Sequence, residues 1–145
     1  MMAARENTNS VLAISATGEV STLVEGLNAP SDVFMWQGKC YVSDTGAGRL
    51  LEVSPRGEVT TLLDGLFDPR GIAAIDNTLY VLDRAAHSIW ALDLAGEDQP
   101  QQIVTHLPIG AICPLDFAGG LCVDGKGGLL VAADGEGSVL RLSKV

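Results

Sequence analysis

The stretch NAPSDVFMWQGKCYVSDTGAGRLLEVSPRGEVTTLLDGL, residues 28–66, decides the fold, because the sequence on either side repeats it. Well-matched positions lie 39 residues apart, so that Gly18-Glu19-Val20 recurs as Gly57-Glu58-Val59. Between residues 11–27 and 50–66, nine of seventeen positions are identical. Self-similarity at a period of about 20 to 50 residues predicts a repeat architecture.

Short apolar runs separated by Gly, Pro and polar turns predict β-strands throughout the chain. In the central unit, four strands are expected at 31–36, 39–43, 49–54 and 58–63. Four antiparallel strands in about 40 residues are typical of one β-propeller blade. Residues 84–94, RAAHSIWALDL, have helical propensity taken alone, but they occupy a strand register of the repeat, so a strand is predicted.

The predicted fold class is therefore all-β, with propeller blades of four antiparallel strands and about three blades per chain. One propeller segment is expected at 11–145, after a flexible N-terminus at 1–10. Its predicted divisions are a partial blade at 11–27 and blades at 28–66, 67–107 and 108–145.

Composition excludes several classes of partner. The 145 residues carry 18 acidic and 9 basic side chains, a formal charge of −9, and the basic residues form no cluster. Nucleic acid is not an expected partner, because its binding relies on Lys and Arg that neutralise phosphates. The opening residues lack the apolar core of a signal peptide, and no long uncharged apolar run follows. We therefore expect a soluble, cytoplasmic protein with no membrane partner.

No catalytic residue or metal site is predicted from motifs. Cys40, Cys113 and Cys122 are odd in number and lack paired metal spacing, and Cys40 and Cys122 lie in strand-like runs where buried thiols are expected. The two histidines, His87 and His106, belong to no motif that links them to a nucleophile.

Three segments carry a recognisable pattern: CYVSDTGAGRLLEV at 40–53, LYVLDRAAHSIWAL at 79–92 and GLCVDGKGGLLVAADGEGSVLRL at 120–142. They resemble the NHL repeat family and its relatives, the gluconolactonase-like and strictosidine-synthase-like propellers. The resemblance extends over 11–145 and implies the propeller fold. These families include enzymes, scaffolds and RNA binders, so it implies no single activity.

Aspartates recur where the second strand of each unit ends, at Asp44, Asp83 and Asp134. A ring of carboxylates could suggest metal binding. The favoured interpretation is structural, because an Asp at this position can hydrogen-bond the backbone of the following turn.

Three dissimilar residues, Asp32, Arg70 and Asp116, stand at roughly equivalent positions where the chain enters the innermost strand, at the mouth of a propeller channel. The leading hypothesis is a module without catalytic activity or cofactor that binds a small ligand or a partner protein there. The alternative is a metal-dependent hydrolase or lyase of the gluconolactonase-like class. The resemblance implies for it a divalent cation such as calcium, with Asp32 and Asp116 among the ligands. A third hypothesis is a fragment of a longer propeller enzyme.

Three blades cannot close a ring, and two copies would supply about six. We therefore expect a homodimer that forms one six-bladed propeller, with an outer strand near 19–24 completing the partner's last blade. Its interface is expected to cover apolar residues of the two terminal blades: Val11, Leu12, Ile14, Leu121, Val123 and Leu130.

Overall fold

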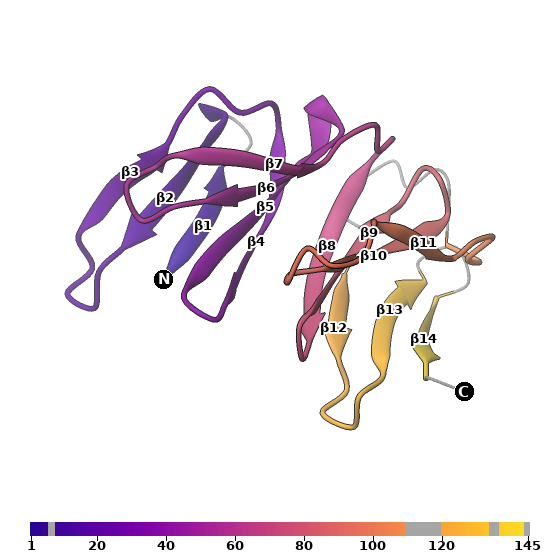
Figure 1. Cartoon of the computed structure of the whole chain (residues 1–145). Helices are drawn as coiled ribbons and strands as arrows, with labels where there is room; N and C mark the ends of the chain where they lie inside the picture. The colour runs from indigo at the N-terminus through magenta and orange to yellow at the C-terminus, as the bar shows by residue number, and fades with distance from the viewer. Residues whose placement is uncertain (6–7, 110–119, 134–136, 144–145) are drawn as a thin grey trace. The chain divides into compact units, whose positions relative to one another are not determined.

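The computed structural model describes residues 1–5, 8–109, 120–133 and 137–143. These residues form an all-β structure of four antiparallel sheets, which we name A to D in chain order (Figure 1). Each sheet is a simple meander, since neighbours in the sheet are also neighbours in the chain. The predicted fold class is confirmed at this level.

The strands follow the repeat. Sheet A contains β1 (Met2–Arg5), β2 (Ser10–Ile14) and β3 (Val20–Val24). Sheet B contains β4 (Pro30–Trp36), β5 (Lys39–Asp44), β6 (Arg49–Val53) and β7 (Val59–Leu63). Sheet C contains β8 (Pro69–Ile75), β9 (Thr78–Asp83), β10 (Ser88–Asp93) and β11 (Gln101–Val104). Sheet D contains β12 (Leu121–Val123), β13 (Leu129–Ala133) and β14 (Ser138–Leu142).

Strand β1 corrects two expectations. We expected a flexible N-terminus at 1–10, whereas Met2–Arg5 pair with β2. Met2 lies opposite Ala13, and the residues 39 positions later, Tyr41 and Glu52, lie opposite each other in sheet B. Strand β1 therefore corresponds to β5, the second strand of its sheet. The chain therefore has four sheets rather than about three blades, and the expected partial blade becomes a three-stranded sheet.

The expected strand at 84–94 is confirmed as β10, despite the helical propensity of its sequence. Every residue of β10 pairs with β9, from Ser88 opposite Asp83 to Asp93 opposite Thr78. Ladder hydrogen bonds and burial of Ile89 outweigh the local preference, because packing commonly overrides propensity.

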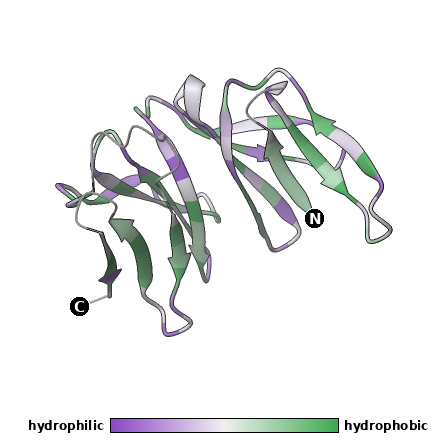
Figure 2. Cartoon of the chain, turned by 180° about the vertical axis from the view of Figure 1, so that it is seen from behind, coloured by the Kyte–Doolittle hydropathy of each residue, from purple (hydrophilic) through white to green (hydrophobic). Residues whose placement is uncertain are grey.

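The chain divides into two compact units, 1–69 and 70–145, and each is described by itself. In the first unit, sheets A and B share a core that includes Val11, Val42 and Leu51. In the second unit, sheets C and D share a core that includes Leu82, Ile89 and Val131. Figure 2 shows the hydrophobic residues running along the strands of both units.

These cores correct the expected list of open apolar residues. Val11 and Leu121 are buried inside their own units, Leu12, Ile14 and Leu130 are half-buried, and Val123 is 43% exposed. The outer strand near 19–24 is β3, and it pairs with β2 of its own chain. It is therefore already used within sheet A.

One backbone hydrogen bond recurs in three sheets and ties the outer strand to the turn between the second and third strands. The N–H groups of Leu27, Leu66 and Leu107 donate to the carbonyls of Asn9, Gly48 and His87 at 3.0, 3.0 and 2.9 Å. The three acceptor residues have left-handed backbone, with φ of 51°, 65° and 50°. All three leucines are buried.

The third full repeat differs from the expected alignment. Asp44 lies opposite Arg49 in sheet B, and Asp83 lies opposite Ser88 in sheet C. At the same register position in sheet D, Ala133 lies opposite Ser138. Ala133 therefore occupies the position predicted for the recurring aspartate. Asp134 itself lies outside the described residues.

Candidate binding site at the strand-entry end

The three candidate residues can be placed only in part. Asp32 lies in β4, beside a register irregularity between Pro30 and Asp32, and its Oδ1 accepts a hydrogen bond from the N–H of Val33 at 2.9 Å. Arg70 is the second residue of β8, and both side chains are half-buried. They belong to separately described units, and Asp116 lies outside the described residues.

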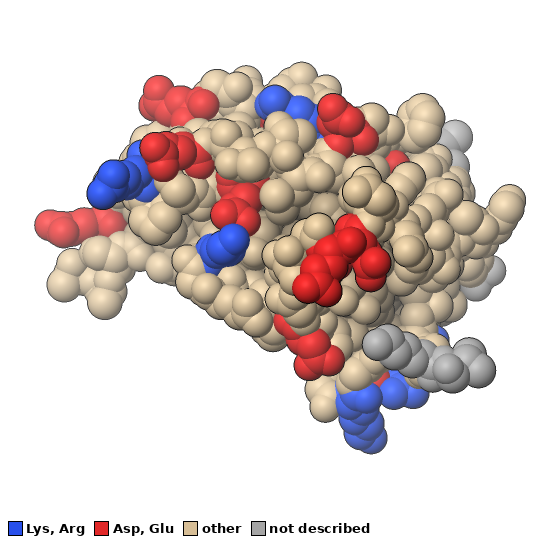
Figure 3. Space-filling model, in the orientation of Figure 1, with Lys and Arg blue, Asp and Glu red and all other residues tan. Residues whose placement is uncertain are grey.

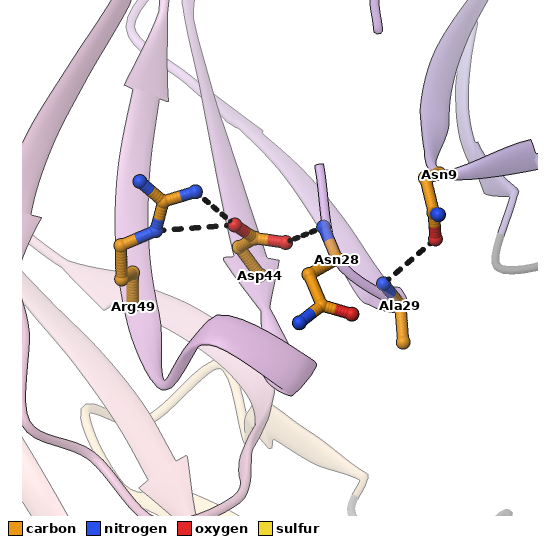
Figure 4. A network of polar contacts seen from close by, with 5 residues as sticks. All are labelled: Asn9, Asn28, Ala29, Asp44 and Arg49. Atoms are coloured by element: carbon orange, nitrogen blue, oxygen red, sulfur yellow. Dashed lines mark hydrogen bonds and ion pairs between the residues drawn. The ribbon is translucent and has the colours of Figure 1, made fainter. Parts of the chain in front are cut away.

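We define the strand-entry end of a sheet as the end where its first strand begins and its second strand finishes. In sheet B, the buried carboxylate of Asp44 organises this end (Figure 4). Its Oδ1 accepts from the N–H of Asn28 at 2.6 Å, and its Oδ2 accepts from Arg49 Nε at 3.2 Å and from Arg49 Nη2. Asp44 therefore holds the linker that leads into β4.

This arrangement supports a structural role for Asp44 but corrects its predicted partner. The sequence suggested the backbone of the following turn, and the turn helix η2 (Thr45–Ala47) has no side-chain cap from Asp44. The carboxylate instead bonds to Asn28, 16 residues earlier, and to Arg49 on the next strand.

Close backbone contacts fix the same linker. The N–H of Gly46 donates to the carbonyl of Asn28 at 2.8 Å, and a Cβ at Gly46 would lie 2.6 Å from Asn28 Oδ1. The N–H of Ala29 donates to Asn9 Oδ1 at 3.0 Å, which connects sheet A to the start of β4 (Figure 4). The chain thus enters β4 along a fixed path.

Two hydroxyl groups complete this end of sheet B. Ser31 Oγ and Thr45 Oγ1 are 2.6 Å apart, and Thr45 Oγ1 donates to the carbonyl of Pro69 at 2.6 Å. Ser31, the residue before Asp32, is therefore held by Thr45 at this end of the sheet. Asp32 is presented from a constrained segment, as a binding side chain requires.

Sheet C has the same scaffold with different side chains. Asp83 is buried like Asp44, but Ser88 replaces Arg49, and the buried Oγ of Ser88 has no hydrogen-bond partner within the described residues. His87 lies at the left-handed position, with Nδ1 at 3.1 Å from the carbonyl of Leu107. His87 therefore donates through Nδ1 and supports a turn.

His106 is a second turn residue rather than part of a nucleophilic pair. Its φ is 58°, close to the values of 78° and 72° at Gly26 and Gly65, which also precede the buried leucine of their sheets. Its Nδ1 lies 3.1 Å from Thr105 Oγ1. His87 and His106 thus occupy places that glycine takes in other sheets.

The cysteines differ from one another in exposure. Cys40 is buried, and burial raises the pKa of its thiol, which disfavours the nucleophilic thiolate. Cys122 is exposed, so the expectation of a buried thiol is wrong there. Cys113 lies outside the described residues. Within the described residues, no group of three or more His, Cys, Asp or Glu side chains could hold a metal ion.

Two turn aspartates were missed from the sequence. Asp93 accepts from the N–H groups of Ala95 and Glu97, and these bonds lower its pKa. Asp124 accepts from the N–H groups of Gly128 and Lys126 and pairs with Arg141, which together lower its pKa to about 2. The signal for Asp93 was available, because Ser54 and Ser15 stand at the same turn position, 39 and 78 residues earlier respectively.

Charge on the surface follows the composition. In Figure 3, acidic side chains are spread over the face shown, with a few basic side chains between them. In the part of the chain that the structure describes, no helix is long and apolar enough to cross a membrane.

Comparison with known proteins places the fold. No family model matches the sequence, and no curated protein sequence matches it either. Solved structures do match. A streptogramin B lyase structure superposes with a TM-score of 0.77 at 12% identity, over 99% of this chain and 47% of that chain. A chain of a nidogen/laminin complex gives 0.77 at 20% identity, over 92% and 52%.

Regucalcin from Agrobacterium tumefaciens strain C58, a calcium-binding protein, gives a TM-score of 0.73 at 21% identity, over 94% of this chain and 51% of that chain. The chain thus spans about half the length of these structures. At such identities the likeness concerns the fold alone. The chain therefore shares the β-propeller fold of these structures, as its repeat predicted.

Proposed function

We propose that the chain is a propeller module that binds a small ligand or a partner protein at the strand-entry end, with Asp32 and Arg70 among the contacting residues and Asp116 as a third. The observation that carries the proposal is a contrast between the repeated scaffold and the residues near the start of the first strand of each sheet, which we call the entry positions. The scaffold repeats down to individual backbone bonds, as at Leu27, Leu66 and Leu107. The residues that enter the first strands carry opposite charges, at Asp32 and Arg70.

Repeat proteins commonly combine such a regular scaffold with variable residues on the surface used for recognition. The carboxylate that recurs in sheets B and C, Asp44 and Asp83, is buried. In sheet B it serves the linker rather than a ligand. This leaves the half-exposed entry positions as the chemically distinctive ones.

Charge-neutral variants test the binding surface. Asp32→Asn keeps an oxygen for the N–H of Val33 while it removes the charge, and Arg70→Gln removes the opposite charge. Ligands and partners would first be identified by thermal-shift screening and affinity capture. Both variants are expected to weaken the identified complex at least tenfold. Circular dichroism and urea unfolding check that both variants remain folded. Unchanged affinity in both variants would refute the proposed surface.

The competing function is a metal-dependent hydrolase or lyase with Asp32 and Asp116 among the ligands of a cation such as calcium. The observation that favours it is the fold shared with a calcium-binding regucalcin. Calcium titration by calorimetry, followed by a crystal structure in calcium, separates the two functions. An ion held by three or more side chains, with Asp32 among them, would replace the binding-module proposal. The third hypothesis, that this chain is one part of a longer propeller enzyme, belongs with this enzymatic alternative.

We also propose that two copies associate. The chain covers 47% to 52% of the three propeller structures compared above, so two copies match the length of one such ring. Two copies carry twice four sheets, and β3 is already paired. The two copies are therefore proposed to pack through the faces of their sheets and not to exchange an outer strand. Two copies would contribute eight sheets, and not the six blades expected from about three blades per chain. The cytoplasmic location stays a prediction of the sequence.

A further inference from the structure

Sheet C has a small polar pocket at the end opposite its strand-entry end. It has a volume of about 140 Å³, and the described residues that line it are Thr78, Ala91, Asp93, Asp98, Gln99 and Gln101. All six belong to sheet C or to the loop between β10 and β11, and the four strands of this sheet lie within the described residues. A cavity of about 150 Å³ can hold a benzene-sized molecule, so the pocket has room for a group of about six non-hydrogen atoms.

In sheet B, the chain's own side chains occupy the equivalent place. Lys39 and Glu52 lie 39 positions before Thr78 and Ala91. Lys39 Nζ lies 3.1 Å from Glu52 Oε2, so an ammonium group pairs with a carboxylate there. The shorter side chains of Thr78 and Ala91 cannot form this pair, and in sheet C these two positions line the pocket.

Sheet A supports this equivalence. Ala13 lies 78 positions before Ala91 and, together with its pairing partner Ser21, lines a pocket of its own sheet. Ala91 likewise lines its pocket together with its pairing partner Gln101. Alanine at this position therefore accompanies a pocket in two sheets, whereas glutamate accompanies an ion pair in sheet B.

The pocket in sheet C is acidic. Asp93 is half-buried and Asp98 is exposed, and none of the described residues that line the pocket is basic. The N–H groups of Ala95 and Glu97 lower the pKa of Asp93, so its carboxylate is charged at neutral pH. The pocket therefore has carboxylates but lacks the ammonium group that Lys39 supplies in sheet B.

We propose that this pocket binds an alkylammonium group, either the head of a lysine side chain from another polypeptide or a small free amine. The three N–H donors of an ammonium group match the carboxylate, amide and hydroxyl oxygens of the lining side chains. The methyl group of Ala91 offers an apolar contact to the alkyl stem. The inference is independent of binding at the strand-entry end.

A metal ion fits this pocket less well than an ammonium group. Calcium takes about six to eight oxygen ligands. Asp93 Oδ1 already accepts from the N–H of Ala95 and from Asn77 Nδ2, and its Oδ2 accepts from the N–H of Glu97. No group of three or more potential metal ligands occurs among the described His, Cys, Asp and Glu side chains.

Chemical-shift titration of the full isotope-labelled chain measures the binding. The two probes are n-butylammonium chloride and the peptide acetyl-GGKGG-amide, and n-butanol at the same ionic strength is the neutral control. We expect saturable shifts of backbone amides in the range 91–101 with an ammonium probe. Saturation by the free amine would identify small amines as ligands, and saturation by the peptide alone would identify a lysine side chain. Absence of saturable shifts with both probes, or equal shifts with n-butanol, would overturn the proposal.

Matched variants locate the bound group. Thr78→Lys combined with Ala91→Glu rebuilds the ion pair of sheet B and should weaken binding of the ammonium probe at least about tenfold. Asp98→Asn removes one charge and should weaken it about threefold or more, the effect of one exposed ion pair. Asp64→Asn, at an exposed position outside the pocket, should leave the affinity unchanged. Circular dichroism checks that the variants are folded. Wild-type affinity in Asp98→Asn or in the folded double variant would refute this pocket as the site.

Discussion

Gly18 and Gly57 occupy the same turn in two sheets but have different surroundings. Their φ values are 87° and 81°, and each N–H donates to the serine three residues earlier. A Cβ at Gly18 would meet nothing within 4 Å, whereas one at Gly57 would lie 2.4 Å from the carbonyl oxygen of Leu23. The pair therefore separates backbone strain from a steric clash.

We expect Gly18→Ala to lower the free energy of unfolding by about 1 kcal/mol, because alanine disfavours positive φ. Gly57→Ala should cost about 1 to 3 kcal/mol more, because the clash adds to the strain. Glu58→Ala, at an exposed position, should cost less than about 0.5 kcal/mol. Urea unfolding measures all three, and equal losses for the two glycine variants would contradict the described packing.

Asp44 is a buried charge whose partners come from two different parts of the chain. Asp44→Ala should lower the free energy of unfolding by about 3 to 5 kcal/mol, because Arg49 loses its partner while the N–H of Asn28 is left unpaired. The control is Asp64→Ala at an exposed position, with an expected change below about 0.5 kcal/mol. A small loss at Asp44, measured by urea unfolding, would mean that the linker is held by other contacts.

The sequence indicated that Asp44 was structural, but its partners could not be predicted. Asn28 and Arg49 are 16 and 5 positions away, and only the sheet brings them to one carboxylate. Asp32 and Arg70 were predicted from their equivalent places in the repeat, and both do lie near the start of a first strand. Asp93 and Asp124 were missed because both lie in turns, outside the alternating apolar pattern; Asp93 could have been found from the serines at the equivalent turn positions of the repeat, Ser15 and Ser54.

At the scale of elements, a repeated pattern was easier to predict than an isolated one. Strand β10 was predicted against its own propensity because its register recurs in other sheets. Strand β1 was missed because its sequence, MAAR, shares no identity with YVSD at the equivalent positions 41–44. Pairing with β2 forms β1, and that pairing is a tertiary effect that the local sequence does not report.

The hairpin between β12 and β13 should respond to acid through Asp124. Its folded pKa of about 2 lies below the ordinary value of 3.8, so its charge stabilises the fold above pH 3.8. This stabilisation is lost as the pH falls toward 2. Asp124→Asn keeps an acceptor oxygen but removes the charge, so it should lower the urea midpoint at pH 6.

The difference between wild type and Asp124→Asn should then shrink between pH 4 and pH 2, where the wild-type carboxylate becomes protonated. Urea titrations at several pH values measure this difference. The exposed Asp64→Asn serves as a control for the general effect of one lost charge. A difference that stays constant with pH would show that Asp124 acts through its shape rather than its charge.

For the whole molecule, the terminal sheets each have one face outside the shared cores. In sheet D, Leu129, Val131 and Ala133 belong to the core with sheet C, so the alternate residues Leu130 and Ala132 point to the other face. Val139 lies opposite Ala132 on that face. In sheet A, Met2 packs on the core with sheet B, so Ala3 and its pairing partner Leu12 point away from it.

Burying these faces against a second copy would stabilise a dimer by about 25 cal/mol per Å² of apolar surface, before entropic losses. Interfaces above about 2,000 Å² are typical of obligate dimers. Light scattering of the wild type should therefore give twice the 15.1 kDa of one chain.

Val139→Lys places a charge on the sheet D face, where the side chain is 67% exposed, and should shift the protein toward the monomer. Val59→Lys, on sheet B, should leave the dimer intact. A wild type of 15.1 kDa in dilute solution would exclude the homodimer. A dimer unaffected by Val139→Lys would instead place the contact on another surface.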